Sequence, residues 1–95
     1  MGELFRYRGI KYAIEDTIKE NNREKEHIHI YDKDNNRFQA FFDKKRRSFY
    51  FDEKKTPRRV RKAALGILND NYDSIESQYK NAMNGRKVNK ITFRR

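Results

Sequence analysis

Hydrophobic and polar residues alternate along the middle of the chain with the period of a β-strand. The alternation covers residues 27–31, 37–42 and 48–51, which are three runs of strand length. The polar segment 32–36, Asp-Lys-Asp-Asn-Asn, has the composition of a tight turn, whereas 43–47 must reverse the chain without a glycine. We therefore predict an antiparallel sheet.

Alternation also gives this sheet two different faces, because successive side chains of a strand point to opposite sides. One face is apolar and is predicted to be buried. It carries Ile28, Ile30, Phe38, Ala40, Phe42, Phe49 and Phe51. The other face combines imidazole and phenyl rings, and it is the face of chemical interest. It carries His27, His29, Tyr31, Phe41 and Tyr50.

The second half of the chain has helical periodicity. Thr56-Pro57 predicts an N-cap followed by proline at the first helical position, and Asn84-Gly85 predicts a left-handed end, so a helical region is expected from about 57 to 84. The poor helix formers at 69–71 predict a kink or a division into two helices. The apolar stripe comprises Val60, Ala64, Ile67, Leu68, Ile75, Tyr79 and Met83.

Two segments fit more than one structure. In residues 9–22, isoleucines at 10, 14 and 18 have helical spacing, whereas apolar residues at 10, 12 and 14 alternate as in a strand. The tail at 91–95 fits an edge strand or a frayed end. The predicted fold class is α+β: a small antiparallel sheet of three or four strands packed against a long or kinked C-terminal helical region. We expect one domain, 1–95, with flexible ends at about 1–4 and 92–95.

Composition favours a small folded protein of the cytoplasm, bacterial or, if phage-encoded, of the host cell. Charged residues make up 40% of the chain, yet thirteen Phe and Tyr residues lie in the patterned runs and favour folding. Without cysteine there is neither a disulfide framework nor a thiolate metal site. The N-terminus has no apolar run of signal-peptide length, no stretch is long enough to span a membrane, and no cofactor is indicated.

Positive charge is concentrated in one stretch: residues 44–62 hold +8 of the total charge of +10. Such a concentration attracts polyanions, which makes nucleic acid the leading partner class; a solvated charge run and an acidic partner protein are the alternatives. The predicted nucleic-acid-binding residues are Lys44, Lys45, Arg46, Arg47, Lys54, Lys55, Arg58, Arg59, Arg61 and Lys62.

The four cations at 58–62 fall at the predicted start of the helix, where the macrodipole disfavours positive charge. Free backbone N–H groups at a helix start bind phosphate, so these side chains predict a phosphate clamp. The turn at 44–47 is predicted to make a second contact to the same nucleic acid. The alternative is a solvated surface.

His27 and His29 are the only histidines, and their i, i+2 spacing on a strand places both rings on one face. Imidazole titrates near pH 6.5, so the pair is a candidate for RNA cleavage, with one ring as base and the other as acid. A metal site would need a third ligand such as Asp32 or Asp34, and none is assigned. A hydrogen-bonded, half-buried pair in a sheet is the structural alternative.

Tyr31, Phe41 and Tyr50 are candidates for stacking against unpaired bases. If a helix at 9–22 covered their face, the three rings would instead belong to the core.

From His27 onward the chain resembles a family of small bacterial proteins of unknown function, often found in toxin–antitoxin-like gene pairs. The shared features are the His-x-His strand, two further strands, the helix opening on 56–59, and Asn84-Gly85 followed by Lys90-Ile91. Weaker similarity reaches back to 7–10, where the family begins a strand. The chain departs from the family at Lys25-Glu26, where prolines are usual, and at Tyr79, where tryptophan is common.

The order of strands and helix is also similar to small ribonuclease toxins with a double-stranded-RNA-binding-like fold. In those toxins the histidine follows a Gly-Ser pair, which is missing beside His27. That likeness implies a fold and no catalytic assignment.

The leading hypothesis is a protein of toxin–antitoxin or mobile-element type that binds nucleic acid, RNA in preference to DNA, with His-dependent RNA cleavage. The alternative is a non-catalytic phage-type inhibitor that binds a host nuclease or ribonucleoprotein complex through its basic face. A structural RNA-binding protein without sequence preference is a third hypothesis.

Overall fold

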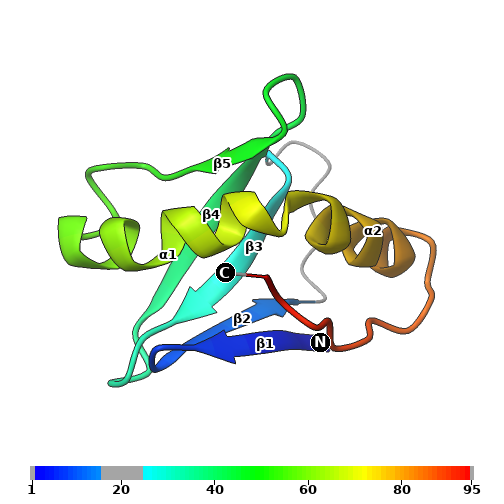
Figure 1. Ribbon diagram of the computed structural model, residues 1–95, viewed down its shortest axis with the longest axis horizontal. Helices are drawn as coiled ribbons and strands as arrows, with labels where there is room; N and C mark the ends of the chain where they lie inside the picture. Colours follow the sequence, from blue (N-terminus) through cyan, green and yellow to red (C-terminus); the bar gives the residue numbers. More distant parts are fainter. Residues whose placement is uncertain (1, 16–24, 95) are drawn as a thin grey trace.

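A five-stranded antiparallel sheet with two helices on one face makes up the fold (Figure 1). The computed structural model describes residues 2–15 and 25–94. The strands are β1 (Gly2–Tyr7), β2 (Ile10–Ile14), β3 (His27–Tyr31), β4 (Arg37–Asp43) and β5 (Ser48–Tyr50), and the helices are α1 (Arg58–Asp70) and α2 (Tyr72–Met83). Strand order in the sheet follows the chain, β1-β2-β3-β4-β5. The predicted α+β class is confirmed, with five strands where three or four were expected.

The two N-terminal strands settle the ambiguity of residues 9–22 as far as they are described. Residues 10–14 form β2, and Ile18, which favoured a helix, lies outside the described residues. Arg8 and Gly9 join β1 to β2 with φ angles of 51° and 79°, the left-handed pair of a tight hairpin turn. The loose end expected at 1–4 is instead structured from Gly2 onward, and Leu4 is fully buried.

The core lies between the sheet and the helices, on the face that alternation predicted. Ile28, Ile30 and Ala40 are fully buried, and Phe38 and Phe51 pack against the edge of the same cluster. From the helices, Val60, Ala64, Ile67, Leu68, Tyr72, Ile75 and Tyr79 complete it.

The division of the helical region near Asn71 is confirmed, and so is the end at Asn84, which is followed by Gly85 in the left-handed region with a φ of 72°. The start differs by one residue. Pro57 itself is the N-cap, because its carbonyl accepts hydrogen bonds from the N–H groups of Val60 and Arg61, and no side chain caps the helix.

One residue of the predicted stripe is also misplaced. Met83 is the last residue of α2 and is 51% exposed, whereas Tyr72, which the stripe omitted, is buried. The break at Asn71 shifts the periodicity between the two helices, so a single stripe could not describe both.

The C-terminal tail packs on the rest of the fold without forming a strand. Ile91 donates its N–H to the Leu4 carbonyl at the edge of β1, and the Phe93 ring stacks on Phe5 with centroids 5.1 Å apart. The Asn71 side chain holds the end of the tail: its amide N donates to the Arg94 carbonyl, and its oxygen accepts from the Arg94 N–H. The tail therefore links the helix junction to β1.

Replacing Asn71 by alanine should lower the free energy of unfolding by about 2 kcal/mol. The side chain is 4% exposed and also donates to the Ile67 carbonyl, so its removal deprives three backbone groups of partners. Denaturant unfolding measures the change. Asn81→Ala is the matched control, since among the described residues the Asn81 side chain bonds only the Gln78 side chain of the same helix, and it should cost about 0.5 kcal/mol or less. Equal losses in the two variants would contradict this role of Asn71.

Candidate nucleic-acid interface

The sheet face turned away from the helices, called the outer face below, carries the two histidines. On β3, His27 lies opposite Phe41 and His29 lies opposite Gln39 of β4. The two imidazole rings are neighbours, with centroids 5.0 Å apart and planes at 80°. The side chains of the outer face include Lys11, Glu15, His27, His29, Tyr31, Arg37, Gln39, Phe41 and Tyr50.

Glu15, which the sequence pattern did not single out, is the centre of the polar contacts on this face. Its Oε1 lies 2.6 Å from Nδ1 of His29, and an Arg37 guanidinium nitrogen lies 3.9 Å from the same oxygen. Burial, followed by a hydrogen bond to Glu15, raises the pKa of the Tyr31 hydroxyl. Three side chains from β3 and β4 thus converge on one carboxylate.

The sequence could have predicted the position of Glu15 only if residues 10–14 had been interpreted as a strand. In a strand, positions 11, 13 and 15 share a face, which sets Glu15 on the histidine side of the sheet. His29 is also more enclosed than a half-exposed sheet residue, with 3% of its surface exposed. The Glu15–His29 pair is therefore part of the packed structure.

His27 is more accessible, and its hydrogen bonds assign its tautomer. Nδ1 lies 2.8 Å from the Lys25 carbonyl, which can only accept, so Nδ1 carries the proton. In the neutral ring Nε2 is then the acceptor, and it lies 3.3 Å from the amide nitrogen of Gln39. The basic nitrogen of His27 consequently faces β4.

Two of the three predicted stacking residues lie together. The rings of Phe41 and Tyr50 have centroids 5.4 Å apart and planes 24° apart, and Tyr50 is 39% exposed. Tyr31 lies at the other end of β3, about 13 Å along the strand from His27, under the ammonium group of Lys11. It does not join the pair.

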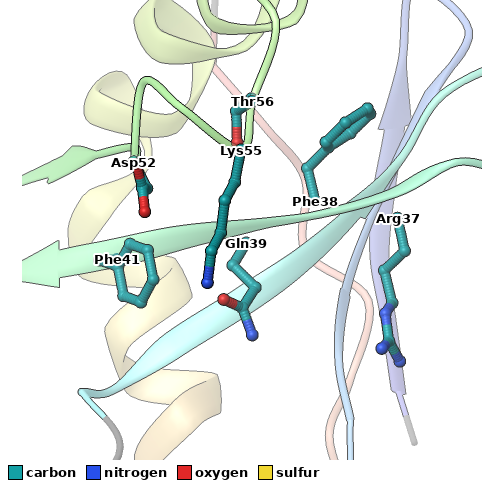
Figure 2. A pocket seen from close by; sticks show the side chains of 7 residues that line it. All are labelled: Arg37, Phe38, Gln39, Phe41, Asp52, Lys55 and Thr56. Carbon is teal, nitrogen blue, oxygen red and sulfur yellow. The ribbon is translucent and has the colours of Figure 1, made fainter.

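A groove beside the ring pair brings one residue of the basic segment to the outer face. Figure 2 shows Lys55 reaching from the loop before α1 toward Gln39, with Phe41 and Asp52 beside it. Since Gln39 contacts His27, this groove adjoins the histidine. Arg37, Phe38 and Thr56 line the rest of it.

The ten predicted nucleic-acid-binding cations do not form one cluster. The turn 44–47 lies near the C-terminal end of α1, where Phe49 of β5 bonds Asn69, whereas 58–62 begin the same helix (Figure 1). Thirteen helical residues separate these groups by about 20 Å. A nucleic acid touching both would have to span that length, about six base pairs at 3.4 Å each.

Half of these cations are engaged with acidic groups. Lys44 pairs with Glu26, Arg46 with Asp43, Arg47 with Asp73, Arg59 with Asp32, and Arg61 with Glu53. Over residues 2–15 and 25–94, no ion pair is present for the other five. These are Lys45, Lys54, Lys55, Arg58 and Lys62.

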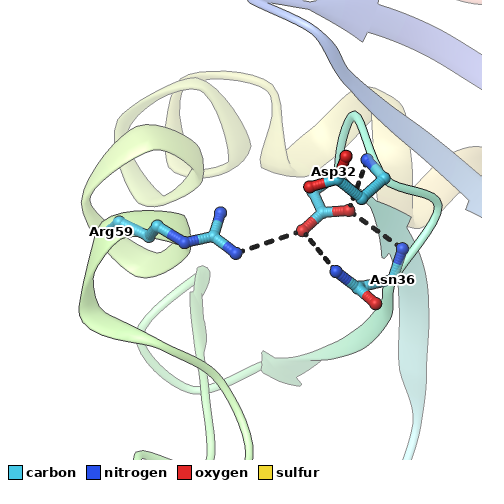
Figure 3. Close-up of polar contacts among 4 residues, drawn as sticks. Asp32, Asn36 and Arg59 are labelled. Atoms are coloured by element: carbon cyan, nitrogen blue, oxygen red, sulfur yellow. Dashed lines mark hydrogen bonds and ion pairs between the residues drawn. The ribbon is translucent and has the colours of Figure 1, made fainter.

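The pairing of Arg59 fixes the start of α1 against the β3–β4 turn. Figure 3 shows the Asp32 carboxylate bonded to Asn36 and to the Arg59 guanidinium, which is 3.2 Å away. The bonds from Asn36, more than the one from Arg59, hold the pKa of Asp32 below its usual range. Arg59 is therefore less available to a phosphate than the sequence suggested.

Asp32→Asn should remove part of the acid dependence of stability. Because folding lowers the pKa of Asp32, its contribution is present above the unfolded value of about 3.9 and is lost as pH falls through the folded value. Urea unfolding between pH 2 and pH 6 should show the variant less stable than wild type at pH 6, with a difference that shrinks as the pH is lowered. Asp34→Asn, a change at an exposed neighbour, is the control. If the stability difference between wild type and Asp32→Asn did not change with pH, this role of Asp32 would be contradicted.

Across the described ranges, no helix is long and apolar enough to cross a membrane, and no group of three or more potential metal ligands is present. Comparison of the chain with models of known protein families, with curated proteins and with solved structures found no match.

Proposed function

We propose that the protein binds single-stranded RNA across its outer face. The observation that carries the proposal is the stacked pair of Phe41 and Tyr50 with cations around it: the Lys25 ammonium lies 5.9 Å from the Tyr50 ring centroid, and Arg37 and Lys55 line the adjoining groove. Sheets that carry aromatic rings and neighbouring cations suit unpaired bases, which have a flat surface for stacking and a phosphate at each step.

Four cations that form no ion pair with another described residue support the same ligand. Lys54 and Lys55 lie in the loop before α1, and Arg58 and Lys62 follow in its first turns. A strand leaving the ring pair toward α1 would pass these charges. Neutralising its phosphates releases counterions, so the affinity should fall as salt is raised.

We prefer RNA to DNA because proteins that recognise an RNA sequence mostly bind its single-stranded segments, whereas those that recognise a DNA sequence mostly read the grooves of the duplex. We further propose a toxin–antitoxin or mobile-element origin, which is supported by the family resemblance of the sequence.

Tyr50→Ala should weaken binding of a fluorescent 12-nucleotide RNA by about tenfold, because one base loses its aromatic partner. Tyr50→Phe keeps the ring and should bind like wild type. Fluorescence anisotropy at two salt concentrations measures both effects, with single-stranded DNA of the same sequence as a comparison. If the alanine variant binds as tightly as wild type, the outer face is not the site. If no nucleic acid binds, a search for an acidic protein partner follows.

We also propose RNA cleavage at this face, with His27 as the base. The specific observation is its tautomer: the Lys25 carbonyl fixes the proton on Nδ1 and makes Nε2 the basic nitrogen, where the RNA 2′-hydroxyl would replace the Gln39 N–H during the reaction. The 2′-hydroxyl would lose its proton to Nε2, its oxygen would attack the adjacent phosphorus, and the bond to the 5′-oxygen would break. The Lys55 ammonium is the group we assign to protonate that leaving oxygen.

In this scheme His29 has a different role from the one the sequence suggested. It is 3% exposed and paired with Glu15, so it supports the His27 ring and does not contact the RNA.

His27→Ala should abolish cleavage, a loss of at least about a hundredfold, while binding changes little. Gel analysis of end-labelled RNA measures the products, and anisotropy measures binding of the same preparation. His27→Ala purified in parallel also controls for contaminating ribonuclease. Cleavage at the wild-type rate by this variant, or intact RNA after incubation with wild type, would remove the enzymatic part and leave RNA binding.

A further inference from the structure

The groove between β4 and the loop before α1 has hydrogen-bonding groups suited to one nucleobase. We propose that it holds a base next to the Phe41–Tyr50 pair and prefers bases with an exocyclic amino group, such as cytosine, over uracil. The inference rests on the proposed RNA binding and deepens it by naming the base chemistry. Figure 2 shows the groups concerned, namely Asp52, Gln39, Lys55 and Phe41.

Asp52 supplies the first acceptor, and its position is fixed by local hydrogen bonds. Its Oδ1 accepts the Lys54 N–H at 3.0 Å, and its main-chain carbonyl accepts the N–H groups of Lys55 and Thr56, each at 3.0 Å. The carboxylate lines the groove, and Oδ2 is the oxygen that remains for a ligand. A carboxylate cannot donate a hydrogen bond, so at this point the groove selects a donor.

Gln39 supplies the second acceptor. Its amide nitrogen lies 3.3 Å from Nε2 of His27, which accepts because Nδ1 carries the proton. The amide nitrogen is therefore directed at His27, and the amide oxygen is the group left for the groove. Both acceptors of the groove thus call for N–H donors on the ligand.

The remaining groups distinguish a base from a free phosphate. Phe41 lines the groove with an apolar ring that suits the flat surface of a base. A phosphate placed here would face the Asp52 carboxylate and be repelled, whereas an amino group would be attracted. Lys55 and Arg37, on the same groove, can reach the phosphate or a ring carbonyl of the bound nucleotide.

Cytosine and uracil provide the sharpest comparison. The cytosine amino group at C4 offers two N–H donors, one for each acceptor of the groove, whereas uracil has a carbonyl at C4 and only the single N–H donor at N3. Titration of fluorescent rC8 and rU8 with wild-type protein should show rC8 binding about tenfold more tightly. Asp52→Asn should remove this preference. The asparagine oxygen can keep the bond to the Lys54 N–H, so its amide N–H group then faces the base and favours the uracil carbonyl.

Glu53→Gln is the matched control. It makes the same change of charge one residue away, on a side chain that is 81% exposed and paired with Arg61 outside the groove. This variant should keep the preference for rC8, which separates base recognition from a general charge effect.

Three outcomes are distinguishable. A preference for rC8 that is lost in Asp52→Asn and kept in Glu53→Gln supports the inference. Equal binding of rC8 and rU8 by wild type, or a preference that Asp52→Asn leaves unchanged, overturns it while the proposed RNA binding stands. Failure of wild type to bind either oligonucleotide overturns the proposed function and the base site together.

Discussion

Aromatic packing around Phe42 holds the helices on one face of the sheet, and the arrangement of the outer face depends on it. The Phe42 ring lies 4.8 Å from the rings of both Phe49 and Tyr79 and 5.8 Å from Tyr72, so it joins β4, β5 and α2. A chain of this length buries a thin core, and these rings provide much of its apolar area. With both helices on this side, imidazole and charged side chains of β3 and β4 are left to the other.

Polar side chains on the outer face form two networks of contacts. One chain of polar contacts joins His29 and Arg37 through the Glu15 carboxylate. A second chain of hydrogen bonds runs from the Lys25 carbonyl through His27 to Gln39. Polar groups that are satisfied in this way hold side chains in defined orientations. The two chains meet where the His27 and His29 rings touch, which connects the enclosed Glu15–His29 contact to a groove that a ligand can enter.

The fold also brings acidic side chains next to part of the basic stretch 44–62. Acidic residues from distant segments, among them Asp32, Glu26 and Asp73, neutralise part of the basic stretch. The cations that lack such partners in the described ranges gather mainly in the loop before α1 and in its first turns, and Lys55 of that loop reaches the outer face. The total charge of +10 therefore overstates the size of the surface that attracts polyanions, but it identifies its sign.

The sequence by itself determined the three strands between His27 and Tyr50, their two faces, and the break and end of the helical region, because strand alternation, the poor helix formers at 69–71 and Asn84-Gly85 act through local geometry. It left β1 and β2 undecided, because the short apolar pattern at 9–22 fits a helix and a strand alike. It also indicated that His27 and His29 share a face. Only the tertiary structure decided that Glu15 meets His29, that Tyr31 lies apart from the ring pair, and that Lys55 alone among the ten cations lines the outer-face groove. Those contacts join residues distant in the chain, and they form only when the strands pair side by side and the loop before α1 packs against β4.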